Sequence, residues 1–214
     1  MFQNRKRILL YVLGSLLLGF VILTILVSYT PIPLFDHEFS EEVQEHQNPF
    51  LDKLMKVVSW PGYAPQSILV VLSVSFVFLL LKKKREAFFI ALTLLSGVIS
   101  GLLKVLIDRP RPTTDLVRII DVAKYKSFPS GHVLLYVIFF GFLIILMSKI
   151  KEINRAVSVA VIAVCAFFIF TIPVSRIYLG AHWFTDVLGS IMLGLLGLSI
   201  LSYFYLKAPG KLED

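Results

Sequence analysis

The chain has 214 residues, of which 57% are hydrophobic and 16% are charged. A water-soluble protein of this length cannot hide so large an apolar share in its core, so a bilayer must cover it. The formal net charge of +7 does not call for nucleic acid as a partner, because basic residues beside membrane spans favour anionic lipid headgroups.

Six apolar runs approach the roughly 20 residues that a helix needs to cross a hydrocarbon core of about 30 Å. They are residues 8–28, 65–81, 87–107, 133–147, 156–174 and 187–206. The fourth is short unless its helix begins within the turn before it. The first follows a basic cluster, as in a signal peptide, but it is too long for a signal core and lacks a cleavage site. We therefore predict an all-α, polytopic membrane protein, with residues 1–214 forming one domain.

Lysines and arginines in short loops predict the orientation, because they resist translocation. Such residues precede the first run, join the second to the third and the fourth to the fifth, and follow the sixth: Arg5, Lys6, Arg7; Lys82, Lys83, Lys84, Arg85; Lys149, Lys151, Arg155; Lys207, Lys211. We expect these segments and both termini to be cytoplasmic. The connection between the first two runs is acidic and is expected outside as a loop: Asp36, Glu38, Glu41, Glu42, Glu45. The connection between the third and fourth runs should also lie outside although it is basic: Arg109, Arg111, Arg118, Lys124, Lys126.

A short amphipathic helix is predicted between the first two runs. Asn48 and Pro49 are typical of a cap followed by a first-turn proline, and apolar residues then recur at helical spacing up to Trp60. Such a helix can lie along the outer interface, and packing against the bundle is the alternative. Cys165, the sole cysteine, is expected to be a buried thiol.

Three polar stretches interrupt the apolar pattern. In the first, KVLIDRPRP, Lys104 lies near the end of the third run and Arg111 follows seven positions later. Pro110 and Pro112 argue against a helix that continues through Arg111, so the chain should leave the membrane here. In the alternative interpretation, Lys104 reaches the headgroups and the arginines anchor the chain at the interface.

The second stretch, KSFPSGHVLLY, precedes the fourth run. Ser130 is a candidate N-cap, Gly131 permits close approach of a ligand, and the first amides of the helix would face an anion placed there. His132 would stand in that first turn. A simple capping turn with an interfacial histidine is the alternative.

The third stretch, SRIYLGAHWFTD, carries Ser175, Arg176, His182 and Asp186. If the sixth helix has begun by His182, its side chain and that of Asp186 share a helical face. A carboxylate that holds one imidazole nitrogen fixes the tautomer and leaves the other nitrogen as a nucleophile. A helix-capping histidine with an acidic residue in the first turn is the alternative.

The predicted topology brings all three stretches to the outer face. Lys104, Arg111 and Arg176 would then form a cationic cradle for a tetrahedral oxyanion, completed by helix amides. Charged groups at membrane depth are costly, so such a cluster indicates a function.

These stretches, Lys104-x6-Arg111-Pro112, Pro129-Ser130-Gly131-His132 and Ser175-Arg176-x5-His182-x3-Asp186, resemble the three-part signature of the type-2 phosphatidic acid phosphatase family. That family shares a superfamily with the vanadium haloperoxidases. The resemblance implies a metal-independent phosphatase without a cofactor. It implies that His182 attacks phosphorus, that Asp186 orients His182, and that His132 protonates the leaving oxygen. The residues that the resemblance assigns to the phosphoryl oxygens are Lys104, Arg111, Ser130, Gly131 and Arg176.

We therefore expect an enzyme of the bacterial cytoplasmic membrane, with its active site on the extracytoplasmic face and a membrane lipid phosphate as substrate. Undecaprenyl pyrophosphate is favoured, and phosphatidylglycerophosphate or phosphatidic acid are alternatives. A lipid phosphotransferase using the same intermediate and a non-enzymatic anion or lipid transporter are the competing hypotheses. The sequence does not indicate the oligomeric state.

Overall fold

The computed structural model describes residues 2–207, with side chains from residue 7 onward, and no strand occurs in this range. Five helical segments are long and apolar enough to cross a membrane, and a sixth is present if the bent pair Pro49–Gly62 and Gln66–Leu80 counts as one span. This confirms the predicted all-α, polytopic architecture.

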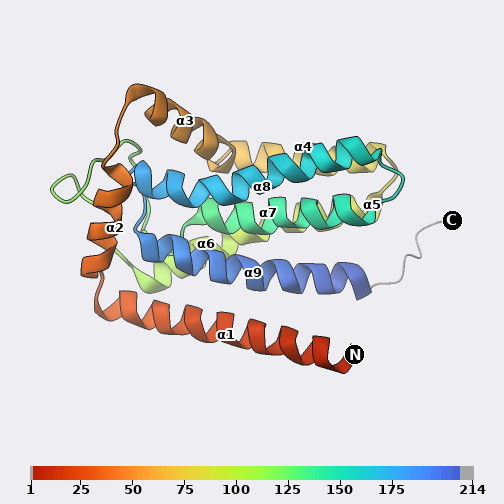
Figure 1. Cartoon of the computed structure of the whole chain (residues 1–214), viewed down its shortest axis with the longest axis horizontal. Coiled ribbons are helices and arrows are strands. Elements are labelled where there is room, and N and C mark those ends of the chain that lie inside the picture. Colours follow the sequence, from red (N-terminus) through yellow and green to blue (C-terminus); the bar gives the residue numbers. More distant parts are fainter. Residues whose placement is uncertain (1, 208–214) are drawn as a thin grey trace.

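The predicted runs correspond closely to the observed helices. Five match single helices, α1 (Phe2–Tyr29), α4 (Gln66–Leu80), α7 (Gly131–Lys149), α8 (Arg155–Tyr178) and α9 (Phe184–Lys207). The third run is divided into α5 (Lys84–Leu92) and α6 (Leu95–Ile107), which together make the span Lys84–Ile107. The helices run side by side along the long axis of the molecule (Figure 1).

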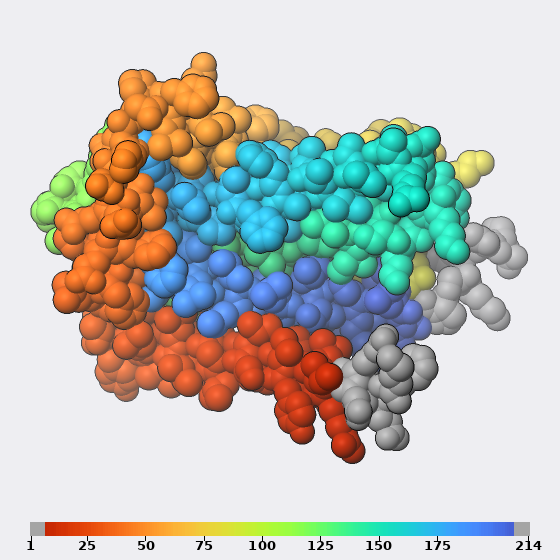
Figure 2. Space-filling view, in the orientation of Figure 1, coloured from red at the N-terminus to blue at the C-terminus, as the bar shows by residue number. Residues whose placement is uncertain are grey.

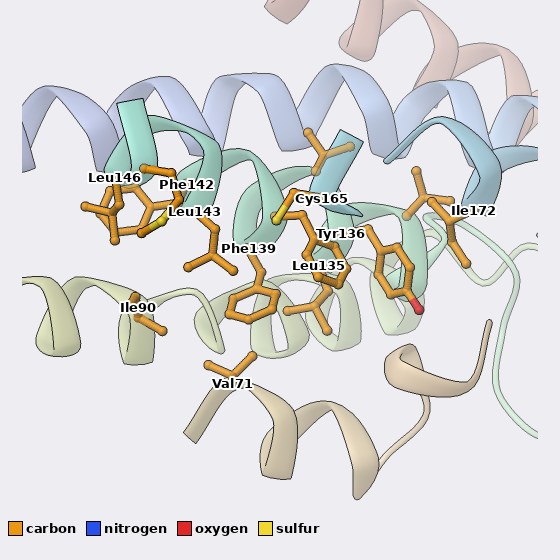
Figure 3. Close-up of a cluster of buried hydrophobic side chains, with 14 of the residues drawn as sticks. Val71, Ile90, Leu135, Tyr136, Phe139, Phe142, Leu143, Leu146, Cys165 and Ile172 are labelled. Atoms are coloured by element: carbon orange, nitrogen blue, oxygen red, sulfur yellow. The ribbon is translucent and has the colours of Figure 1, made fainter. Parts of the chain in front are cut away.

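Helix α7 is the centre of the bundle, where it packs against α8 and α9. Its residues are buried almost all the way round, as expected of a uniformly apolar helix surrounded by others. Phe139 and Phe142 of α7 lie in one cluster with Val71 of α4, Ile90 of α5 and Cys165 of α8 (Figure 3). The thiol is buried, as predicted. Residues 127–130, which form the turn before α7, are buried as well.

The acidic connection after α1 is not a loop, contrary to the prediction. It contains the helix α2 (Leu34–Gln44), which lies across one end of the bundle (Figures 1 and 2). Asp36, Ser40 and Gln44 recur every four residues and form its buried face, whereas the glutamates point outward. Residues 34–44 have no apolar stripe, because this helix buries polar side chains that bond to other elements.

The predicted amphipathic helix is α3 (Pro49–Ser59), and its cap is confirmed. The Asn48 side chain accepts a hydrogen bond from the Leu51 amide at 2.8 Å, with Pro49 in the first turn. A 3₁₀ turn, η1 (Trp60–Gly62), follows, and the axis bends by 60° before α4. Helix α3 packs against α8, so the packing role that was considered as the alternative is present.

The two ends of the bundle differ in character. The start of α1, the end of α9 and the connections α4–α5 and α7–α8 lie at one end (Figure 1). Helix α2 and the 108–130 connection lie at the other. The basic connections that were predicted to be cytoplasmic thus share one side, while Lys211 and the side chains of Arg5 and Lys6 lie outside the described residues. That this side is cytoplasmic stays a prediction.

Candidate active site

His182 and Asp186 form a contact at the end of the bundle that carries α2. His182 Nδ1 lies 3.3 Å from Asp186 Oδ2, and both side chains are buried. Helix α9 begins only at Phe184, so His182 belongs to the turn before the helix and not to its first turn. The contact forms because Asp186 folds back over the helix start and accepts a hydrogen bond from the Trp183 amide at 2.9 Å, as in a capping box.

Arg111 lies on the other side of the His182 ring. Its Nη1 is 3.3 Å from His182 Nε2, and its guanidinium also donates to the carbonyls of Tyr125, Lys126 and Ala181. Helix α6 ends at Ile107, so the chain has left the helix before Arg111, as the two prolines predict. The imidazole therefore stands between a carboxylate and a guanidinium.

Lys104 turns inward from the last turn of α6. Its Nζ donates to the carbonyls of Lys126 at 2.7 Å and Ser127 at 3.0 Å, and it lines the same cavity as His132. A lysine that only reached the headgroups would not make these bonds. Its ammonium group is thus held at the cavity wall by two backbone acceptors.

Burial and three positive charges act on the His182 imidazole. Burial, reinforced by the positive charges of Arg111, Lys104 and Arg176, holds the pKa of His182 well below its ordinary value of 6.5. Burial lowers the pKa of Arg111 to about 10, which leaves it charged at neutral pH. His182 is therefore a neutral imidazole within reach of three cations, the state that a nucleophile requires.

The start of α7 presents polar groups that lack partners. Ser130 is the N-cap, but its side chain makes no capping bond, and its buried Oγ has no hydrogen-bond partner among the described residues. The same holds for His132 Nε2 within residues 7–207. Unpartnered buried polar atoms are rare in native proteins and ask for an explanation. A ligand that bonds to both atoms would supply one.

Arg176 is fixed by residues that the sequence analysis did not single out. Its guanidinium donates to Ser59 Oγ at 3.0 Å, to Tyr63 Oη at 3.3 Å and to Asp121 Oδ2 at 2.8 Å. Tyr63 in turn donates to Asp121 at 2.6 Å. The Nε of Arg176 is buried and makes no bond within the described part of the chain. No local pattern could have revealed these partners, because they lie 55 to 117 positions away.

The last residue of η1, Gly62, and the next residue, Tyr63, form one wall for His132. The rings of Tyr63 and His132 meet edge to face, with centroids 4.7 Å apart. A Cβ on Gly62 would lie only 2.3 Å from His132 Cδ2. The His132 ring thus occupies the space that a side chain at position 62 would need, and it cannot move towards Gly62.

An apolar cavity of about 720 Å³ extends from these groups between α4, α6 and α7. Lys104 and His132 line its polar end, and small residues of α6, Gly97 and Gly101, line its length. Val105, another lining residue, is 78% exposed on the surface of the bundle. The cavity therefore connects the cationic site with the surface that faces the lipid.

Residues 85–209, more than half of the chain, match the PAP2 superfamily. The chain belongs to the PAP2 superfamily. The matched region contains all eight site residues that the resemblance implied, whereas Gly62, Tyr63 and Asp36 precede it.

Two curated proteins are similar in sequence. Phosphatidylglycerophosphatase B of Bacillus subtilis (strain 168) is 27% identical over 190 residues, which are 85% of this chain and 89% of that protein. Lipid A 1-diphosphate synthase of Escherichia coli (strain K12) is 29% identical over 126 residues, 49% of each chain.

Two crystal structures share the fold. The transmembrane PAP2-type phosphatidylglycerolphosphate phosphatase from Bacillus subtilis superposes with a TM-score of 0.82 at 22% identity, over 94% of this chain and 99% of that one. Aquifex aeolicus LpxE gives a TM-score of 0.58 at 24% identity, over 80% and 94%. The protein is thus a multi-pass membrane phosphatase of the PAP2 superfamily, a phosphoric ester hydrolase, as the resemblance implied.

Proposed function

We propose that the protein hydrolyses phosphate monoesters or pyrophosphates of membrane lipids, without a metal ion, through a phosphohistidine on His182. The observation that carries this proposal is the position of His182, with Asp186 at Nδ1 and Arg111 at Nε2. In this proposal, Nδ1 of His182 keeps its proton and donates a hydrogen bond to Asp186. Nε2 then carries the lone pair and faces the cations that would hold a phosphoryl group. Such a site supplies alignment and charge stabilisation, which are the main demands of phosphoryl transfer.

In the first step, Nε2 of His182 forms a bond to phosphorus and the bond from phosphorus to the lipid oxygen breaks. The imidazolium form of His132, which the negative charge of a bound phosphate favours, gives its proton to that oxygen and becomes neutral. Lys104, Arg111 and Arg176 hold the phosphoryl oxygens, together with Ser130 Oγ and the Gly131 amide at the start of α7. The unpartnered atoms of Ser130, His132 and Arg176 support these roles.

In the second step, water attacks the phosphohistidine. His132, now without its proton, accepts a proton from this water, and inorganic phosphate leaves with the phosphorus–nitrogen bond broken. Neither step requires a carboxylate cluster. Within the described residues, no group of three or more His, Cys, Asp or Glu is placed to hold a metal ion, and the proposed site carries its positive charge on side chains.

The apolar cavity supports a lipid as substrate. A headgroup phosphate at Lys104 and His132 would leave its acyl or prenyl chain in the cavity lined by Gly97 and Gly101. The chain could then enter sideways from the bilayer, so the lipid would not have to leave hydrocarbon. We place this site on the extracytoplasmic face, because it lies at the end of the bundle opposite the basic connections α4–α5 and α7–α8.

Phosphatidylglycerophosphate is the first candidate substrate, because the relative that aligns over most of both chains is named for it. Undecaprenyl pyrophosphate, which the sequence analysis favoured, is the second, since an outward site suits recycling of that carrier. The name of the other relative, a diphosphate synthase, keeps transfer to a lipid acceptor as the competing outcome.

The test uses the purified full chain in detergent with EDTA, offered each candidate lipid in turn. We expect phosphate release that EDTA does not reduce. We expect His182→Ala to abolish turnover, and His132→Ala to retain a slow rate that rises with a better leaving group, since general acid catalysis contributes about 10² to 10⁴-fold. Equal residual rates for the two variants would contradict these roles, and a product that appears only with an added acceptor would favour the phosphotransferase.

A further inference from the structure

Buried charged side chains form linked ion pairs behind His182 and Asp186, the proposed catalytic dyad. Arg109 Nη2 donates to Asp36 Oδ2 at 2.6 Å, and its Nη1 donates to Asp186 Oδ1 at 2.5 Å. All three side chains are fully buried. Arg109 lies two positions before Arg111, and Asp36 belongs to α2, outside the region that matches the PAP2 superfamily. The roles proposed above use neither residue.

The guanidinium of Arg109 is fixed from every side. Its Nε donates to the Pro31 carbonyl at 2.8 Å, and Nη1 also reaches Thr185 Oγ1 at 2.6 Å. Asp36 accepts from the Thr185 hydroxyl at 2.6 Å and from the Thr185 amide at 2.8 Å, which satisfies a free N–H at the start of α9. A planar fork can serve two carboxylates at once in this way, whereas an ammonium group is a single point of charge.

Asp186 is held on both of its oxygens. Oδ1 accepts from Arg109, and Oδ2 accepts from the Trp183 amide, from the Ser127 hydroxyl and from His182 Nδ1. Without Arg109, Oδ1 would lose its charged donor, and only the bonds to Oδ2 would still orient the carboxylate towards the imidazole.

We propose that Arg109, backed by Asp36, is a positioning residue that locks the Asp186 carboxylate against His182 and thereby fixes the tautomer and direction of the nucleophile. This inference rests on the proposed roles of His182 and Asp186. It also gives α2 a function, because this helix carries Asp36, the counter-ion of Arg109.

Replacing Arg109 and replacing Asp36 should change the protonation of His182 in opposite directions. The groups that face the dyad are Lys104 from α6, Arg111 and Ser127 from the 108–130 connection, His132 from α7, Arg176 from α8, and Arg109 with Asp36 behind Asp186. Loss of the Arg109 charge favours protonation of His182, whereas loss of the Asp36 charge disfavours it. Arg109→Lys, which keeps the charge, separates this charge effect from the orienting role of the guanidinium.

The experiment compares Arg109→Gln, Asp36→Asn and Arg109→Lys in the full chain, with phosphate release followed from pH 4 to 9 in EDTA. We expect Arg109→Gln to lower kcat by about 10²-fold, the loss typical of a reacting group displaced by about 1 Å, with little change in KM. The acid limb of kcat should move to higher pH in Arg109→Gln and to lower pH in Asp36→Asn. Arg109→Lys keeps the charge but not the fork, so kcat should fall while the limb stays in place.

Arg118→Gln is the matched control. Arg118 forms a two-bond ion pair with Asp52 at the same end of the bundle, and it touches neither His182 nor Asp186. Its removal should leave kcat and the pH profile unchanged. If Arg109→Gln does not fold, as a thermal unfolding scan would show, Arg109→Lys and Asp36→Asn decide the question.

Two kinds of failure are separable. If His182→Ala retains turnover, the proposed function is wrong at its core. If His182→Ala is inactive while the Arg109 variants keep the wild-type kcat, or if the acid limb moves the same way for Arg109→Gln and Asp36→Asn, only the positioning role is overturned.

Discussion

Gly62→Ala is expected to impair catalysis although it replaces no proposed catalytic residue. The added Cβ would lie 2.3 Å from His132 Cδ2, 2.9 Å from Cγ and 3.0 Å from Tyr136 Cε2. Ordinary carbon–carbon contact begins at about 3.5 Å, so the imidazole must give way by about 1 Å. The ring lines the cavity and can yield into it, so the chain should still fold.

The magnitude follows from the displacement. A shift of about 1 Å in a catalytic group costs roughly 10²-fold in rate, which corresponds to about 2.7 kcal/mol in the barrier. The loss should not exceed that of His132→Ala, because the misplaced ring retains some function as an acid. Overpacking itself typically costs about 1–3 kcal/mol of stability.

The assay compares a lipid phosphate with 4-nitrophenyl phosphate, whose leaving group needs little protonation. We expect Gly62→Ala to lose much more activity on the lipid than on the nitrophenyl ester. Gly14→Ala on α1 is the control, since nothing lies within 4 Å of its added Cβ. Wild-type kcat for Gly62→Ala on the lipid, in a folded protein, would refute the argument that His132 is confined by this wall.

Two further predictions concern pH and the lipid chain. Because burial and the nearby cations hold the pKa of His182 well below 6.5, the imidazole stays neutral as pH falls towards that value, and activity should be lost only at more acidic pH. A profile of kcat/KM that collapses at 6.5 or above would contradict this. Gly97→Leu or Gly101→Leu adds a side chain in open space along the cavity wall. Either variant should lower kcat/KM for long-chain lipids by about tenfold or more, since each buried methylene contributes about 0.8 kcal/mol. The same variants should leave 4-nitrophenyl phosphate hydrolysis unchanged, and equal losses on both substrates would point to a folding defect instead.

Much of the fold could be predicted because its signals are local. A helix that crosses hydrocarbon must be apolar over its whole length, so the runs in the sequence mark α1, α4, α7, α8 and α9 directly. The Asn48 cap and the helix end before Pro110 are equally local, since they depend on residues within one turn. Helix α2 was missed because its buried face is polar.

The dyad illustrates how far local spacing reaches. The four-residue separation of His182 and Asp186 correctly predicted their contact, although the helix starts after His182. A capping bond to the Trp183 amide, and not a shared helical face, brings the two side chains together. The pattern thus indicated the right pair for a different geometric reason.

The sequence by itself determined that the chain lies in a lipid bilayer, how many apolar runs it has and which residue types form an oxyanion site. It could do so because hydropathy and motif spacing are properties of neighbouring positions. Only the tertiary structure decided which groups support that site. Asp36 meets Arg109 across 73 positions and Thr185 across 149, and Gly62 makes room for His132. Contacts between residues so distant along the chain depend on how the helices pack, and no local pattern carries that information.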